Sequence, residues 1–170
     1  MITEAKDLLE GIVKARIEKV TVVRSAMEES GAIMKRQFPL VALITNPGQF
    51  DGSEARTYRY FEGERYEQRY ARGNRNLPIL LRCWSTSEAE ADKVFSRILP
   101  AIPSQWDYDN FTGTIEIGTE EHSDHTGNVA KLYCSIVDVR FSVAAAMEPG
   151  EVPYYKEVVL EEGEIINQGD

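Results

Sequence analysis

A run of strand-forming residues near the end of the chain restricts the fold more than any other feature. It extends from Val129 to about Ala146 and is rich in β-branched residues. Strands in globular proteins commonly have about 5–6 residues. A strand of this length is therefore expected to be bent or bulged, or to project beyond its domain.

Three amphipathic helices are predicted upstream of this run, over residues 3–14, 26–37 and 88–99, because their apolar residues recur at helical spacing. The second helix begins after Ser25, which forms a capping box with Glu28. It is expected to bury Ala26, Ile33 and Met34. Each helix can therefore cover part of a sheet with one apolar face.

Strands are predicted over residues 18–24 and, as a continuous apolar run covered on both faces, over Leu40–Thr45. A strand, a helix and a strand in this order suggest one parallel pair joined by a right-handed crossover. The remaining strands are expected to be antiparallel. The predicted fold class is α+β, with a mainly antiparallel (mixed) sheet and helices packed on one face.

Residues 55–72 are predicted to form a hairpin around Gly63. A loop with Gly73 and Asn74 then leads to a strand over residues 77–84, where Pro78 indicates an edge position or an unpaired amide. Trp106 and Tyr108 are placed in a loop, and the polar stretch 118–128 is also predicted to be a loop, between two strands.

Charge divides the chain into two halves, although the net charge is -9 overall. Residues 1–82 carry 14 bases and 11 acids, whereas residues 83–170 carry 5 bases and 17 acids. General nucleic-acid binding is disfavoured, since phosphate contacts need a dominant basic face. Opposite local charges can instead join copies of the chain head to tail, into rings or filaments. A solvated surface with random variation in sign is the alternative.

The last residues cannot build a core alone, because they combine seven acids and two prolines with small apolar clusters. We expect one α+β domain over residues 1–147 and an acidic C-terminal arm or tail over 148–170. The apolar clusters favour an arm that orders on a neighbouring molecule. No membrane segment or secretory signal is expected from the sequence.

Catalytic chemistry finds little support in the residues. His122, Asp124 and His125 are the one local group that resembles a metal or acid–base site, and a metal there would need Glu120 or Glu121 as a further ligand. A solvated hairpin tip is the preferred interpretation. Cys83 and Cys134 lie in apolar runs without activating partners. We therefore expect no enzyme, no catalytic residue, no metal and no cofactor, with a small metal-dependent enzyme as an alternative.

The Arg/Tyr-rich hairpin is the strongest candidate for a binding surface, because arginine and tyrosine are favoured in protein interfaces. A purely structural hairpin is one alternative, and binding of single-stranded nucleic acid by stacking is another, which the interleaved glutamates weaken. The candidate residues for contacts with other subunits or partners are Arg56, Tyr58, Arg59, Arg65, Tyr66, Arg69, Tyr70, Tyr154 and Tyr155.

The order of these segments also resembles a known family. An amphipathic helix, FPLVALITNPGQFD, the hairpin RTYRYFEGERYEQRY, LPILLRCWSTSEAEADKVFSRILPAIP and a long strand before EPGEVPYYKEV follow one another. This layout, over about residues 1–160, resembles the tail-terminator and neck (tail completion) proteins of long-tailed bacteriophages, particularly the Mu-like and contractile-tailed group. The acidic extension over 161–170 departs from a compact terminator.

The resemblance implies a structural protein of the virion without catalytic residues. The expected assembly is a homo-oligomeric ring, hexameric in the family, that caps the tail tube and joins it to the head-side connector. DNA would pass through the ring without specific binding. The expected location is the tail–neck region of the virion, and the host cytoplasm during assembly. A neck or head–tail connector adaptor is the alternative within this class.

Overall fold

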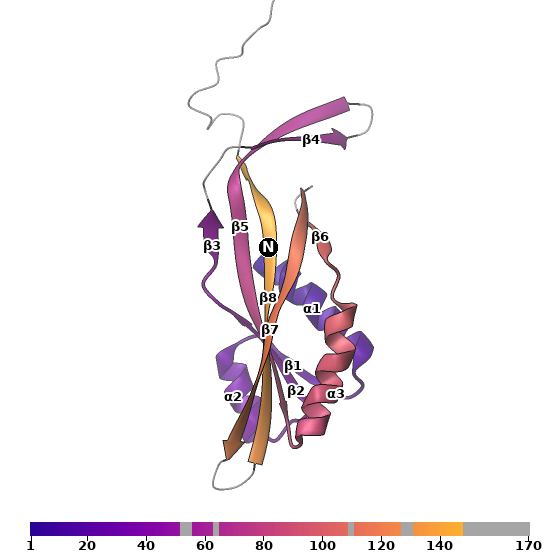
Figure 1. The fold of residues 1–170 in the computed structure, drawn as a ribbon, viewed down its shortest axis with the longest axis vertical. Coiled ribbons are helices and arrows are strands. Elements are labelled where there is room, and N and C mark those ends of the chain that lie inside the picture. The colour runs from indigo at the N-terminus through magenta and orange to yellow at the C-terminus, as the bar shows by residue number, and fades with distance from the viewer. Residues whose placement is uncertain (52–55, 63–64, 109–110, 127–130, 148–170) are drawn as a thin grey trace, which may run out of the picture.

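The computed structural model describes residues 1–51, 56–62, 65–108, 111–126 and 131–147, which form one sheet and the helices beside it (Figure 1). The helices are α1 (Ile2–Arg16), α2 (Ala26–Met34) and α3 (Glu88–Ile98), and a 3₁₀ turn, η1 (Leu99–Ala101), follows α3. The strands are β1 (Thr21–Val23), β2 (Leu40–Thr45), β3 (Gln49–Asp51), β4 (Arg56–Glu62), β5 (Arg65–Ser85), β6 (Gln105–Tyr108), β7 (Phe111–Thr126) and β8 (Lys131–Met147).

The strands pair in the order β1-β2-β5-β8-β7-β6, and β3 and β4 also pair with β5. The β1–β2 pair is parallel, as the strand–helix–strand order predicts, and every other described pair is antiparallel. The predicted α+β class with a mainly antiparallel, mixed sheet is therefore confirmed. No described helix combines the length and apolar character needed to span a bilayer.

The helices cover the sheet unequally. Helices α1 and α3 pack on one face, where buried residues of both helices join a cluster with Val41 of β2 and Leu81 of β5. Helix α2 lies on the opposite face, because its Glu29 contacts Arg82 and Trp84, which alternate with the core-facing residues of β5. The expectation of helices on one face thus holds for α1 and α3, and β2 is covered on both sides.

The core lies between α1, α3 and the sheet. Its largest fully buried side chains include Leu9 of α1, Phe95 of α3 and Phe141 of β8. Trp106 packs edge to face against Phe141, with ring centroids 5.1 Å apart. At about 1.5–3 kcal/mol for each large apolar side chain, this burial is the main stabilising contribution.

Two long strands extend the sheet beyond the helices. The predicted loop at Gly73 and Asn74 is wrong, because the chain continues through this point as β5, with a register shift against β8 between Ala71 and Asn74. Strand β8 covers the predicted long run, and its pairing with β7 also shifts, between Ile117 and Glu120. Bulges of this kind increase twist and let long strands bend.

Pro78 lies in the central strand β5 rather than at an edge. Its carbonyl accepts a hydrogen bond from the amide of Asn46, at the point where the neighbour of β5 changes from β2 to β3. A strand residue's N–H and C=O point to the same side. The nitrogen of Pro78, which carries no hydrogen, therefore faces this junction between β2 and β3 and not β8.

Three further predictions are wrong. Residues 118–126 continue strand β7 instead of forming a loop, and Trp106 and Tyr108 belong to strand β6. Helix α2 buries Glu29 and Ala32, whereas Ala26 is exposed, Ile33 is half-buried and Met34 is 83% exposed. The inward face of α2 is therefore set by a polar contact rather than by its apolar residues.

Candidate interaction sites

The predicted Arg/Tyr hairpin is present as β4 and the first part of β5. Seven successive positions pair, from Arg56 opposite Ala71 to Glu62 opposite Arg65. Within the described residues β4 has no second neighbouring strand, and only Tyr70 and Ala71 of this part of β5 pair with β8. Figure 1 shows the hairpin bending away from the helices at one end of the sheet.

The register brings most of the predicted interface residues together along this ribbon. Tyr58 is opposite Arg69, and Arg59 is opposite Gln68. Tyr66 and Tyr70 take positions that alternate with Arg69, so the tyrosine positions are divided between the two faces of the ribbon. Tyr154 and Tyr155 lie outside the described residues.

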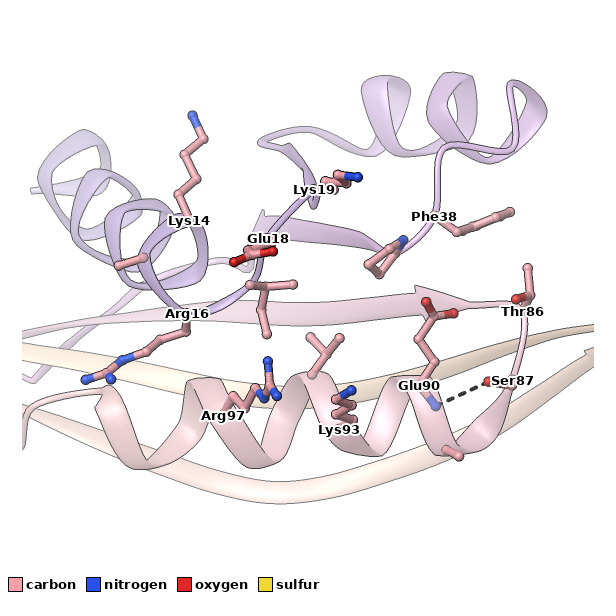
Figure 2. Close-up of a pocket in the computed structure, with 15 residues that line it drawn as sticks. Lys14, Arg16, Glu18, Lys19, Phe38, Thr86, Ser87, Glu90, Lys93 and Arg97 are labelled. Carbon is pink, nitrogen blue, oxygen red and sulfur yellow. Dashed lines mark hydrogen bonds between the residues drawn. The ribbon is translucent and has the colours of Figure 1, made fainter.

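A cleft of about 970 Å³, which sequence reasoning did not identify, lies between the end of α1 and α3 (Figure 2). Buried Ile17 and Val94 line it together with the half-buried Phe38 and Pro39. Its other lining residues are mainly charged or small: Lys14, Ala15, Arg16, Glu18, Lys19, Thr86, Ser87, Ala89, Glu90, Lys93 and Arg97. The cleft thus combines an apolar base with charged walls.

Basic side chains outnumber acidic ones around this cleft. Lys14 pairs with Glu10, Nζ to Oε1 at 2.5 Å, and points away from α3 in Figure 2. The other four bases form no ion pair with any described residue: Arg16, Lys19, Lys93 and Arg97. Only Glu18 and Glu90 offset them among the lining residues. An anionic partner would therefore find unpaired cations here.

This cleft has no local signature in the sequence, because three separate segments build it. Arg16 is the last residue of α1 and Lys19 follows that helix, Phe38 precedes β2, and Lys93 and Arg97 lie one turn apart on α3. The one local clue is that Lys93 and Arg97 are spaced i, i+4 on a helix whose other side is apolar. Two like charges there are unfavourable for the isolated helix.

The histidine region differs from the predicted solvated tip. His122 lies in β7, where its Nδ1 is 2.9 Å from Ser135 Oγ and its Nε2 is 3.6 Å from Glu120 Oε1. Asp124 instead pairs with Lys131, Oδ2 to Nζ at 3.1 Å. The side chain of His125 lies outside what the structure describes. No described group of three or more His, Cys, Asp or Glu residues could hold a metal ion.

Both cysteines are buried and unpaired with each other, as their apolar surroundings predict. Burial raises the pKa of the Cys83 thiol and of the Cys134 thiol to about 12, and nearby charges contribute less. At neutral pH both thiols are therefore protonated, which is the unreactive form. Neither has the environment of a nucleophile.

A buried polar cluster, also missed from sequence, joins α2 to the sheet. Glu29 is only 4% exposed, and its Oε2 accepts a hydrogen bond from Arg82 Nη1 at 3.1 Å. Its Oε1 accepts a second one from Trp84 Nε1 at 2.6 Å. Arg82 therefore holds a helix in place and stands apart from the hairpin arginines. Both of these contacts of Glu29 join elements of the same chain, which favours a structural role.

Comparison with protein-family models gave no match, and comparison with curated proteins gave no significant match.

Proposed function

We propose that this protein is a structural component of a bacteriophage virion, a tail terminator whose copies assemble into a ring on the tail tube. The ring, expected to be hexameric, would join the tube to the head-side connector. The proposal rests on the resemblance in segment order together with one structural observation, the projecting hairpin.

The hairpin carries the proposal because it lacks the support that such an element needs. A two-stranded ribbon is marginally stable in water unless it packs against something else. The outer edge of β4 has no described partner along all seven residues of the strand, from Arg56 to Glu62. Such an edge is a ready template for pairing with another chain. A neighbouring subunit would supply the missing support.

The arginine content of the hairpin suits a contact between unlike surfaces. Arg56, Arg59, Arg65 and Arg69 lie in the paired part of β4 and β5, whereas residues 83–170 carry a net charge of -12. Guanidinium groups pair bidentately with carboxylates. A head-to-tail contact between a basic ribbon and an acidic surface closes into a ring when the rotation between copies is right.

The first experiment measures self-association of the full chain by light scattering coupled to size exclusion, with and without purified phage tail tubes. We expect the chain to form a closed oligomer, either by itself or only when tubes are present. In the Arg65→Glu/Arg69→Glu variant, association should weaken by at least about tenfold, because partner carboxylates are then repelled. The loss should be larger at 50 mM than at 500 mM salt.

The matched control is Lys35→Glu/Arg75→Glu, which makes the same change in net charge at two exposed positions away from the paired residues of β4. It should associate like the wild type. A chain that stays monomeric with and without tubes would disprove the proposal. Binding to connector but not to tubes would favour a neck adaptor instead.

A further inference from the structure

The cleft between α1 and α3 has a chemistry that matches one segment of this same chain. Residues 148–170 carry seven acids against the single base Lys156. The cleft presents Arg16, Lys19, Lys93 and Arg97 without ion-pair partners among the described residues. In a protein with a net charge of -9, such a cluster of unpaired cations is the surface that an acidic segment would select.

The apolar character of the two partners also matches. Residues 148–170 include the apolar clusters Tyr154–Tyr155, Val158–Leu160 and Ile165–Ile166, each flanked by acids. At the base of the cleft lie Ile17 and Val94, beside Phe38 and Pro39. Interfaces gain most of their affinity from apolar anchors in pockets, surrounded by polar contacts. An acidic segment with aliphatic anchors meets both requirements.

We propose that this cleft binds the acidic C-terminal segment, residues 148–170, of a second copy of the chain. The proposal deepens the proposed function, since it rests on self-association and names the segment that links neighbours. It adds a contact that is separate from the hairpin.

Geometry favours a second copy over the chain's own cleft. Strand β8 ends at Met147, opposite Tyr70, whereas Ser85, two residues before the cleft residue Ser87, pairs with Tyr133. Along β8, Met147 and Tyr133 are 14 residues apart, which corresponds to about 46 Å at 3.3 Å per residue. Figure 1 shows the end of β8 beside the hairpin, far from the start of α3.

Reaching the Ser87 end of its own cleft would therefore cost the segment most of its anchors. About 14 extended residues would be needed to reach the Ser87 end, at no more than about 3.4 Å each. Residues 148–161 contain two of the three apolar clusters, so only Ile165–Ile166 would remain for binding. A neighbour placed beside the end of β8 could receive all three clusters.

Disulfide cross-linking of full-length chains tests the contact directly. A Lys93→Cys variant is mixed with a Glu161→Cys variant and oxidised mildly at pH 8. The native cysteines do not compete, because Cys83 is 0% and Cys134 is 2% exposed. We expect a covalent dimer of the two variants, at least about fivefold above the yield from Lys35→Cys mixed with Glu161→Cys. Lys35 is an exposed lysine that does not line the cleft.

The outcomes separate this proposal from the proposed function. A yield no higher than the Lys35→Cys control overturns the inference, even where rings form normally. A chain carrying both Lys93→Cys and Glu161→Cys that links only to itself overturns the assignment to a second copy. If rings are lost in Arg65→Glu/Arg69→Glu but cross-linking persists, the two contacts are independent. If the chain neither forms rings nor binds tubes but still cross-links, the proposed function is wrong and the binding of the acidic segment to the cleft still holds.

A charge swap gives a second readout. Lys93→Glu/Arg97→Glu should reduce the cross-linking yield between Arg16→Cys and Glu161→Cys chains by about tenfold when placed in the cleft partner. Adding Glu162→Lys/Glu164→Lys to the other partner should restore most of it, because the sign of both surfaces is then reversed. Failure of the swap to restore any yield would contradict recognition by charge.

Discussion

The indole nitrogen of Trp84 donates a 2.6 Å hydrogen bond to Glu29, a carboxylate that is 4% exposed beneath helix α2. Arg82, two residues earlier on the same strand, binds the other oxygen of this carboxylate. One buried anion thus fixes α2 to the face of the sheet opposite α1 and α3. Because removing one partner from such a cluster leaves the others unsatisfied, its contribution can be measured by substitution.

Glu29→Ala should destabilise the fold by about 3 kcal/mol, at the low end of the range for a broken buried pair. The low end applies because the side chain of Arg82 keeps 30% of its surface in water. Glu29→Gln keeps an acceptor for Trp84 and should lose only about 1–2 kcal/mol. Urea unfolding measures both. Glu121→Gln, at an exposed position, is the control, and equal losses for Ala and Gln would contradict a role for the Trp84 bond.

Gly113 should not accept even a methyl group. A Cβ at this position would lie 2.4 Å from the carbonyl oxygen of Ser142 and 2.6 Å from Nε1 of the buried Trp106. Gly113→Ala should therefore cost about 2–3 kcal/mol through overpacking. Gly31→Ala is the matched control, because a Cβ there meets nothing within 4 Å and α2 gains about 0.5–1 kcal/mol. Thermal unfolding should show opposite shifts, and two shifts of equal sign would refute this reading of the packing.

The two buried thiols predict a loss of stability at alkaline pH. Their pKa is about 12 in the folded chain, against 9.0 for an ordinary thiol, so the folded state keeps both protons above pH 9 while the unfolded state releases them. The contribution of the two protonated thiols to the free energy of unfolding is therefore complete below pH 9. It is lost as the pH rises toward 12, by up to about 2.7 kcal/mol per pH unit for the two groups together. Urea unfolding at pH 8, 9 and 10 measures this slope.

The control for the thiol effect is the Cys83→Ala/Cys134→Ala variant, whose stability should fall less between pH 9 and 10. Other groups titrate in both proteins, so the difference in slope isolates the thiols. Identical slopes would mean that the thiols titrate alike in the folded and unfolded chains.

Sequence reasoning succeeded where the determinants are local. Helix α3 could be predicted because Ser87 caps it, Val94 and Phe95 belong to its apolar stripe, and Pro100 follows its end. Strand β2 could be predicted because an uninterrupted apolar run is the mark of a strand covered on both faces. The hairpin could also be predicted from a local pattern, because its two arms alternate on either side of Gly63.

Long-range contacts account for the failures. The inward face of α2 depends on Arg82 and Trp84, which lie 53 and 55 residues after Glu29, so nothing within the helix could reveal it. Residues 120–126 pair with β8 although the stretch is polar on both faces, because the ladder is formed by backbone groups and not by side chains. The cleft escaped prediction because the end of α1, the residues just before β2 and helix α3 meet there only after folding.

Removing residues 148–170 should leave the fold intact and weaken the oligomer. All residues of the buried core cluster lie between Met1 and Val143, and β8 completes its pairing with β5 at Met147. The chain ending at Met147 should therefore keep its urea midpoint as a monomer within experimental error, since no described core contact is lost. Its self-association, followed by light scattering across a dilution series, should weaken by at least about tenfold, because each lost anchor removes apolar burial and charge pairing. Global unfolding of the shortened chain would instead assign the acidic segment to the core, and unchanged association would remove it from the subunit contact.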